Sequence, residues 1–379
     1  MGLVKFGNLV KEVKINIDRN NNPYEYYVAG DHMDSEDLTI RRKGSFATDD
    51  VGPAFTRLFK PGQILYGSRR TYLKKVAVAD FEGICSNTTF VLETKDESKL
   101  RQRLLPFIML TDDFTKWSIS KSKGSTNPYI LFSDLANYEF ELPDINRQDE
   151  LVKLLWQAYE TKESYKEMIR ATDEMVKSQF IEMFGLPSAN HKAFKIGCIA
   201  DIVSDIHYGT SRQSVENGDY PYLRMNNITY TGELDLSDLK RISIPEEELS
   251  GCIVKKGDVL FNRTNSKDLV GKTCSFPLEQ PMVIAGYIIR LRMNGLVHPE
   301  YLSVFLNLSG SKKMLRDLSK GAVGQANINA KEVQSIRILI PPIELQNQFV
   351  VVKNQADKSK FELKQAIEKI DKVMRALMQ

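Results

Sequence analysis

Residues 122–148 read SKGSTNPYILFSDLANYEFELPDINRQ, and residues 319–346 read SKGAVGQANINAKEVQSIRILIPPIELQ. Both stretches open with Ser-Lys-Gly and reach a proline through an apolar run, FELP in the first and ILIP in the second. In both, an isoleucine follows that proline at the second position and a glutamine at the fifth. A shared spacing with few identities is typical of a diverged repeat. We therefore interpret the chain as two copies of one unit, each roughly 190 residues long.

The repeat extends upstream of these two stretches. Residues 61–70 (PGQILYGSRR) resemble residues 256–265 (KGDVLFNRTN), and residues 104–117 (LLPFIMLTDDFTKW) resemble residues 302–315 (LSVFLNLSGSKKML). Short β-rich runs broken by glycine, asparagine and proline come first in each copy, and a helical segment, a loop and a strand follow. Each copy is therefore predicted to begin with a mixed α/β domain, which makes the fold class α+β.

A long helix is predicted after each mixed domain. No proline or glycine occurs between Pro143 and Gly185, and Gly185-Leu186-Pro187 is a helix stop. Apolar or small residues recur at alternating steps of three and four, which is the period of a coiled coil. Each helix would be roughly 50 Å long at about 1.5 Å per residue. We expect the two long helices to pack antiparallel as a coiled coil, with the two pseudo-symmetric mixed domains at opposite ends.

These patterns predict four segments along the chain. The mixed domains are expected over residues 1–145 and 187–343, and the long helices over residues 146–186 and 344–379. The side chains expected to pack between the two helices are Leu151, Leu154, Ala158, Tyr165, Met168, Phe349, Val352, Leu363, Ile370 and Leu377.

Composition excludes several classes of protein. No apolar run reaches the roughly 18 residues of a membrane helix, and the N-terminus lacks the apolar core of a secretory signal. The four cysteines and four histidines are scattered, without the spacing of a metal site. The net charge of +3 is by itself weak evidence for a nucleic-acid partner. We expect a cytoplasmic protein without a metal site.

Loops rich in basic, amide and hydroxyl side chains lie at equivalent places in the two copies. Arginine and lysine pair with guanine, asparagine and glutamine pair with adenine, and serine, threonine and lysine contact phosphates. A single loop of this composition is at least as typical of an ordinary solvated loop as of a DNA-binding one. The presence of the same composition in both copies favours contact with DNA. The candidate DNA-binding residues are Arg69, Arg70, Lys74, Lys123, Ser125, Asn127, Tyr208, Arg212, Arg224, Asn226, Asn227, Arg263, Asn265, Lys267, Lys272, Lys320, Gln325 and Asn327.

Asn127-Pro128-Tyr129 raises an alternative, because it is close to the Asn-Pro-Pro-Tyr loop with which amino-methyltransferases hold a flipped base. That chemistry also needs a site for S-adenosylmethionine, and no Gly-x-Gly-x-x-Gly follows a strand. The equivalent loop of the second copy, SKGAVGQANIN, lacks the tripeptide. A stand-alone DNA adenine methyltransferase remains the alternative enzyme, and a coiled-coil scaffold that binds only proteins remains the alternative without DNA.

The order of mixed domain, helix, mixed domain and helix resembles the specificity subunit of type I restriction–modification systems. The resemblance covers essentially the whole chain and has one fairly specific pattern, GST-x-x-x-I followed by Leu-Pro and then glutamine. Residues 20–50 depart most, because no counterpart of YLRMNNIT is evident there. The stretches that carry the resemblance are GSTNPYILFSDLANYEFELPDINRQDELV (124–152), SQFIEMFG (178–185), YLRMNNIT (222–229) and GDVLFNRTNS (257–266).

The resemblance implies a function without catalysis in this chain. Two target recognition domains would each read one half of a bipartite sequence in double-stranded DNA, and the helices would act as conserved spacers. The helices would also bind two modification (methyltransferase) subunits, and restriction (endonuclease and translocase) subunits would join them. S-adenosylmethionine, ATP and Mg²⁺ would belong to those partner subunits, and this chain would hold no cofactor.

Overall fold

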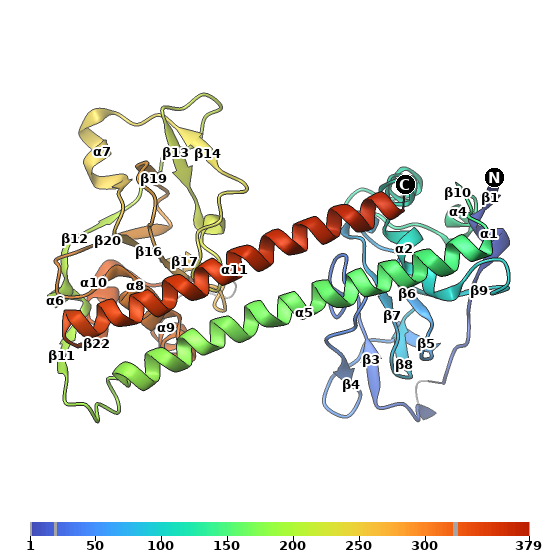
Figure 1. The fold of residues 1–379 in the computed structure, drawn as a ribbon, viewed down its shortest axis with the longest axis horizontal. Helices are drawn as coiled ribbons and strands as arrows, with labels where there is room; N and C mark the ends of the chain where they lie inside the picture. The colour runs from blue at the N-terminus through green and yellow to red at the C-terminus, as the bar shows by residue number, and fades with distance from the viewer. Residues whose placement is uncertain (1, 19–20, 321–324, 379) are drawn as a thin grey trace. The chain divides into compact units, whose positions relative to one another are not determined.

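The computed structural model describes residues 2–18, 21–320 and 325–378. The chain divides into two compact units, which we call unit 1 (residues 1–165 and 365–379) and unit 2 (residues 166–364). Each unit contains one mixed domain and parts of two long helices, α5 (Ile145–Phe184) and α11 (Ile343–Leu377). Figure 1 shows these elements.

The mixed domain of unit 1 contains two four-stranded sheets. Every neighbouring pair of strands is antiparallel except β3 and β8, which run parallel. The first sheet has the order β2 (Val10–Glu12), β9 (Thr89–Thr94), β6 (Ile64–Gly67), β7 (Val76–Val78). The second has the order β4 (Gly44–Ser45), β3 (Tyr26–Val28), β8 (Gly83–Ser86), β5 (Phe55–Phe59).

The mixed domain of unit 2 repeats this topology. Its one parallel pair among the described strands, β13 with β19, stands where β3 with β8 stands in unit 1. The first sheet has the order β12 (Val203–Tyr208), β20 (Ile288–Met293), β16 (Asp258–Asn262), β18 (Thr273–Ser275). The second has the order β14 (Lys240–Ile242), β13 (Tyr220–Leu223), β19 (Met282–Ile284), β15 (Ile253–Val254). The duplication and the α+β fold class predicted from the sequence are confirmed.

Shorter elements complete both units, and among the described residues α7 of unit 2 has no counterpart in unit 1. Two-stranded sheets join each unit's first strand to the strand before its long helix. These are β1 (Leu3–Lys5) with β10 (Glu139–Glu141), and β11 (Lys195–Cys198) with β22 (Arg337–Ile340). The helices are α1 (Phe6–Leu9), α2 (Leu105–Leu110), α3 (Asp112–Lys121) and α4 (Phe132–Leu135) in unit 1, and α6 (Ile199–Ile202), α7 (Glu246–Cys252), α8 (Pro299–Asn307), α9 (Ser309–Leu318) and α10 (Ala330–Gln334) in unit 2.

The two long helices pack on each other within each unit through equivalent contacts. In unit 1, Lys162 of α5 donates to Asp371 of α11 at 2.6 Å. In unit 2, Lys360 of α11 donates to Asp173 of α5 at 2.7 Å. The lysines and the aspartates are both 198 positions apart (360 − 162 and 371 − 173), so one ion pair occurs twice with the helices exchanged.

The direction of packing is clear inside unit 2. There the ring of Phe184 lies 5.6 Å from that of Phe349, while Asp173 pairs with Lys360. A later position on α5 therefore meets an earlier one on α11, so the helices are antiparallel, as predicted.

Two of the predicted seam residues are wrong. Leu154 and Met168 are 43% and 52% exposed, whereas Leu155 is fully buried and Ile169 is half-buried. In both places two apolar residues are adjacent in the sequence, so the three-and-four spacing alone does not show which of the two is buried. Lys162 also lies in the seam, where it pairs with Asp371, although the spacing of apolar residues does not predict a lysine there. Of the others, Leu151 and Phe349 are buried, and Ala158, Tyr165, Val352, Leu363, Ile370 and Leu377 are half-buried.

The glutamine five residues after each proline ties the start of a long helix to its domain. Gln346 is fully buried, and its Nε2 donates to the carbonyls of Pro341 at 2.8 Å and Leu296 at 3.2 Å. Its Oε1 accepts from the His298 backbone at 2.7 Å. Gln148 makes the same three bonds in unit 1, to the Pro143 and Lys99 carbonyls and from the Arg101 backbone. The spacing seen in the sequence is therefore a structural anchor.

Replacing Gln346 with leucine should destabilise unit 2 by about 1–3 kcal/mol, because it leaves buried backbone groups without partners. Urea unfolding followed by circular dichroism measures this. Gln348→Leu, at an exposed position on the same helix, is the matched control and should change little. Equal stability of the two variants would contradict the anchoring role.

A half-buried carboxylate joins the mixed domain of unit 2 to α11. Glu233 accepts from Lys360 at 2.9 Å and also pairs with Lys364. Burial alone would raise the pKa of Glu233, but the hydrogen bonds from Lys364 and Lys360 outweigh it, and the pKa is lowered. A carboxylate with a lowered folded-state pKa stabilises above its unfolded pKa of about 4.3, and that stabilisation is lost as pH falls through the folded pKa.

Glu233→Gln should therefore cost stability at pH 7 and cost progressively less below about pH 4. The measurement is the free energy of unfolding of both proteins across that range. Glu246→Gln, at an exposed position on α7, is the control. A loss that stayed constant from pH 7 to pH 3 would show that the ion pairs of Glu233 do not govern the effect.

Candidate nucleic-acid interface

Two basic loops that are far apart in the sequence meet in unit 1. The backbone of Arg70 donates to the Pro128 carbonyl at 2.7 Å, and Ile130 donates to the Ser68 carbonyl at 2.9 Å. Lys123 and Tyr129 exchange backbone hydrogen bonds at 2.8 and 2.9 Å, closing the loop between them. Residues 67–75 and 122–130 therefore form one surface.

The equivalent loops of unit 2 meet in the same way. Strand β17 (Thr264–Asn265) pairs with β21 (Ala326–Asn327), and Ile328 donates to the Arg263 carbonyl at 2.9 Å. Lys320 and Asn327 exchange backbone hydrogen bonds at 3.0 and 2.8 Å, as Lys123 and Tyr129 do in unit 1. Part of the predicted second loop, residues 321–324, lies outside the described residues.

A tight turn beside the parallel strand pair is the third element. In unit 2 the Arg224 backbone donates to Oδ1 of Asn227 at 2.8 Å, and the Asn227 backbone donates to the Arg224 carbonyl at 2.9 Å. In unit 1 the Ala29 backbone donates to Nδ1 of His32 at 3.1 Å, and the His32 backbone donates to the Ala29 carbonyl at 3.0 Å. Residues 20–50 therefore do contain a counterpart of YLRMNNIT, contrary to the prediction. The two turns share their hydrogen bonds but not their residue types, so the sequence alone does not show that they are equivalent.

We call these three segments together the three-loop face of each unit. In unit 1 it comprises residues 29–33, 67–75 and 122–130. In unit 2 it comprises the described residues of 224–228, 262–272 and 320–328.

One lysine in each unit holds the turn against its neighbouring loop. Lys272 is 7% exposed, and its Nζ donates to the Met225 carbonyl at 2.6 Å. Burial lowers the pKa of the Lys272 ammonium. Lys75 donates to the Gly30 carbonyl in the same way. Lys272 was predicted to contact DNA, but its ammonium is buried on a backbone carbonyl, so its role is to fix the turn.

Asn227 is a second correction to the predicted DNA-binding residues. It is 1% exposed, and its Nδ2 donates to the Asp235 carbonyl at 2.8 Å and the Asp238 carbonyl at 3.3 Å. Its oxygen already accepts from the Arg224 backbone. The Asn227 amide therefore shapes the turn, whereas Asn226 at the tip is exposed and its Nδ2 donates to Oδ2 of Asp238 at 3.4 Å.

The other predicted residues differ in their exposure and in their partners. Arg69, Arg70, Ser125, Asn127, Lys267 and Gln325 are exposed. Asn265 is half-buried, and its amide bonds to Asn262. Asn327 is half-buried on β21 and accepts from Thr264. The basic side chains in ion pairs are Lys74 with Asp112 and Glu36, Lys123 with Asp134, Arg212 with Glu248, Arg224 with Asp238, and Lys320 with Glu332.

Ion pairs of this kind hold a basic side chain in place before a ligand arrives. Lys123 lies 3.3 Å from Asp134, and Lys320 lies 2.8 Å from Glu332. The carboxylates stand at equivalent places, 198 positions apart (332 − 134), on α4 and α10. An anion that binds there must share the lysine with the carboxylate or displace it.

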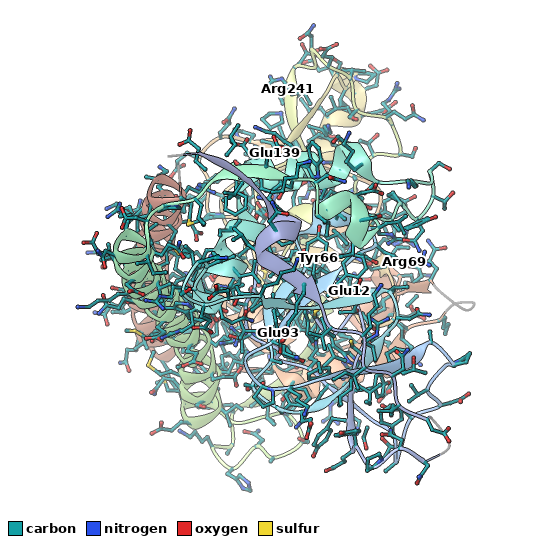
Figure 2. All side chains as sticks on the ribbon, turned by 90° about the vertical axis from the view of Figure 1, so that its right-hand side faces the viewer. Glu12, Tyr66, Arg69, Glu93, Glu139 and Arg241 are labelled. Atoms are coloured by element: carbon teal, nitrogen blue, oxygen red, sulfur yellow. The ribbon has the colours of Figure 1, made fainter. Side chains whose placement is uncertain are left out.

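One arginine of each three-loop face lies over the ring of a tyrosine. The Arg263 guanidinium lies 4.8 Å from the centre of the Tyr208 ring, and Tyr208 Oη accepts from the Ala330 backbone at 2.9 Å. The buried Nε of Arg263 has no hydrogen-bond partner within the described residues. Arg69 lies 6.0 Å from the Tyr129 ring, and Figure 2 shows it on the side of its domain away from α5. Guanidinium groups held against aromatic rings are suited to guanine and phosphate.

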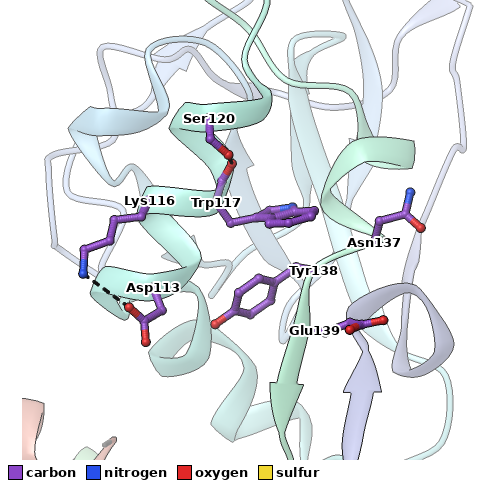
Figure 3. Close-up of a pocket in the computed structure, with 7 residues that line it drawn as sticks. All are labelled: Asp113, Lys116, Trp117, Ser120, Asn137, Tyr138 and Glu139. Atoms are coloured by element: carbon purple, nitrogen blue, oxygen red, sulfur yellow. Dashed lines mark hydrogen bonds and ion pairs between the residues drawn. The ribbon is translucent and has the colours of Figure 1, made fainter.

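A hollow in the mixed domain of unit 1 is drawn in Figure 3. Its aromatic walls are Trp117 and Tyr138, where the repeat places the non-aromatic residues Leu315 and Ile336. Its lining residues are Asp113, Lys116, Trp117, Ser120, Asn137, Tyr138 and Glu139. A function shared by both units therefore does not depend on it.

Metal-binding clusters and membrane-spanning helices are both absent from the described part of the chain. Residues 2–18, 21–320 and 325–378 contain no cluster of three or more histidine, cysteine or acidic side chains able to hold a metal ion. Over the same residues, no helix has the length and apolar character needed to cross a bilayer.

Known proteins share both copies of the repeat. The family described as Type I restriction modification DNA specificity domain matches residues 9–171 and 190–372. The EcoKI type I restriction enzyme specificity subunit of Escherichia coli K12 is 25% identical over 274 residues, covering 66% of this chain and 59% of that protein. The putative MjaX specificity subunit of Methanocaldococcus jannaschii is 26% identical over 184 residues, covering 48% and 43%. The matched region spans about half the length of these curated relatives.

Solved structures share the fold over the whole chain. The type I restriction–modification system S subunit from M. genitalium aligns with a TM-score of 0.54 and 15% identity, covering 100% of this chain and 96% of that one. A chain from a study of complex assembly and conformational transition of the type I R-M system gives a TM-score of 0.54 and 18% identity, with the same coverage. With both copies of its repeat matched, this chain belongs to the family of type I restriction modification DNA specificity domains.

Proposed function

We propose that this chain is the specificity subunit of a type I restriction–modification complex and reads a bipartite DNA sequence, one half with each three-loop face. One observation carries the proposal. The two faces have the same backbone hydrogen bonds but different exposed side chains, Arg69 and Asn127 in unit 1 against Lys267 and Gln325 in unit 2. A repeated frame with different side chains is suited to reading two different short sequences in similar DNA.

The mixture of side chains on each face suits double-stranded DNA. Exposed arginine, asparagine and glutamine side chains have the donors and acceptors that identify bases in the major groove. The paired lysines, Lys123 and Lys320, suit the phosphates, whose contacts fix the position of a protein on the duplex. A nearly balanced net charge of +3 places this basic surface beside an acidic remainder, so binding would depend on the faces and not on the charge of the whole chain.

The long helices offer a second kind of surface for partner proteins. Met175 and Val373 are 49% and 55% exposed and stand at equivalent positions, 198 apart (373 − 175). Phe361 is 59% exposed. Apolar side chains that form a contiguous exposed patch commonly mark a protein interface. We assign this surface to two modification subunits, one for each copy, with restriction subunits joining that complex.

Catalysis and cofactors would belong to the partners. Asn127-Pro128-Tyr129 has a structural explanation here, since the Pro128 carbonyl accepts from Arg70 and Tyr129 pairs with Lys123. S-adenosylmethionine, ATP and Mg²⁺ are therefore proposed to bind the modification and restriction subunits, in a complex that acts on DNA in the cytoplasm.

The test compares the chain alone with the complex. Purified chain mixed with labelled S-adenosylmethionine and DNA should transfer no methyl group, and addition of modification subunits should give methylation. Methyl transfer by the chain alone would restore the stand-alone methyltransferase. Failure of the assembled complex to bind any DNA would favour the protein scaffold instead.

A further inference from the structure

We propose that Asp31 and Asn226 are equivalent specificity-determining residues, each reading one base of its own half-site. The proposal rests on the proposed function and deepens it. It assigns unit 1 a base-reading side chain outside the loops predicted from the sequence, and it predicts which class of base each side chain selects.

The equivalence comes from strand register and hydrogen bonding. Strands β3 and β13 pair in parallel with β8 and β19, which places Val28 opposite Cys85 and Leu223 opposite Ile284. Each turn begins one residue later and is closed by the side chain three positions on, His32 or Asn227. Asp31 and Asn226 each stand immediately before that closing residue.

Each turn is fixed by a buried residue that follows it and by a lysine that bonds one of its carbonyls. Met33 and Ile228, which follow the closing residues, are 1% and 0% exposed. The ammonium of Lys75 or Lys272 fixes the carbonyl just before Asp31 or Asn226. A turn anchored on both sides presents its tip side chain in a fixed place, which a base-specific contact requires.

Asp31 and Asn226 are both exposed at these tips. The Nδ2 of Asn226 donates to Oδ2 of Asp238 at 3.4 Å, a long contact that pairing with a base would replace. Lys75 and Lys272 also bond through their backbones to the loops that bear Arg69 and Arg263, because Gly67 donates to the Lys75 carbonyl at 3.0 Å and Asn262 to the Lys272 carbonyl at 2.8 Å. The tip residues thus belong to the same face as these two arginines.

The chemistry of the two side chains differs in one respect. An asparagine amide both donates and accepts, so Asn226 can form the bidentate pair with N6 and N7 of adenine. An ionised aspartate only accepts, so Asp31 selects a base that offers an amino group without a neighbouring acceptor, which is the N4 amino group of cytosine. The two half-sites should therefore contain a cytosine read by unit 1 and an adenine read by unit 2.

The experiment uses the complete complex in a host without other DNA methylation. Methylome sequencing of the wild type should give a bipartite motif. Asp31→Asn should change one position of one half-site, with methylation at sites carrying the original cytosine reduced about tenfold or more, as expected for loss of one base contact. The other half-site should be unchanged. Asn226→Asp should give the converse in the other half-site.

Asp80→Asn is the matched control, since Asp80 is an exposed aspartate of unit 1 outside the three-loop face, and its motif should equal that of the wild type. An unchanged motif in Asp31→Asn would overturn the proposal, as would a uniform change of methylation at all sites, which would indicate a charge effect only. A bipartite wild-type motif with no response to Asp31→Asn would leave the proposed function standing. Absence of any bipartite motif in the wild type would overturn that function itself.

Discussion

Replacing Phe180 with alanine should lower the free energy of unfolding of unit 2 by about 3–5 kcal/mol. Phe180 is fully buried where α5 meets the domain and α11. Its ring centre lies 4.8 Å from Tyr301, 4.9 Å from Phe184 and 5.3 Å from Phe349. Truncation removes this contact area and leaves a cavity that three rigid rings cannot readily fill.

Thermal unfolding measures the effect. A loss of that size corresponds to a fall of roughly 10 °C in Tm for a unit of about this length. Ile181→Ala, one position along the same helix where the side chain is 46% exposed, should change Tm by little. Similar values for the two variants would contradict the packing of α5 into the core of unit 2.

Replacing Arg69 and Arg263 together with alanine should weaken DNA binding by the complex about 30-fold or more. Each arginine contacts a different half-site in this account, and loss of one good base contact costs about 1–3 kcal/mol. Contacts in separate units should add, because they share no partner. Each single variant should lose its own share, and neither should disturb assembly with the modification subunits.

The measurement is the dissociation constant for a duplex carrying the target, at fixed salt, since phosphate contacts make affinity depend on ionic strength. Arg147→Ala with Arg337→Ala is the control, because both are exposed arginines outside the three-loop faces. Unchanged binding in the Arg69 and Arg263 variant would show that the faces are assigned wrongly. Equal loss in both pairs would show a general effect of charge.

Much of the fold was predictable because each sequence pattern occurs twice, once in each copy of the repeat. Pro143 and Pro341, each with its glutamine five residues later, marked the helix starts, and the structure shows why, since the glutamines bond the neighbouring backbone. The exact seam was not predictable, because Leu154 and Leu155 are both apolar and only the packing shows that Leu155 is inside.

The candidate site was predictable in outline and less so in detail. Equivalent loops around Arg69 and Arg263 were evident from the sequence, and hydrogen bonds bring each to its second loop. Which polar side chains are used internally was not evident, because Asn227 and its exposed neighbour Asn226 have the same chemistry. Burial separates them, and burial depends on contacts with residues distant in the sequence.

The central claim, that one chain reads a split sequence with two equivalent faces, is tested most directly by methylome sequencing of a host that carries the complete system. The account predicts a single motif made of two short specified half-sites separated by a spacer of fixed length and unspecified sequence. A short continuous palindrome would contradict it.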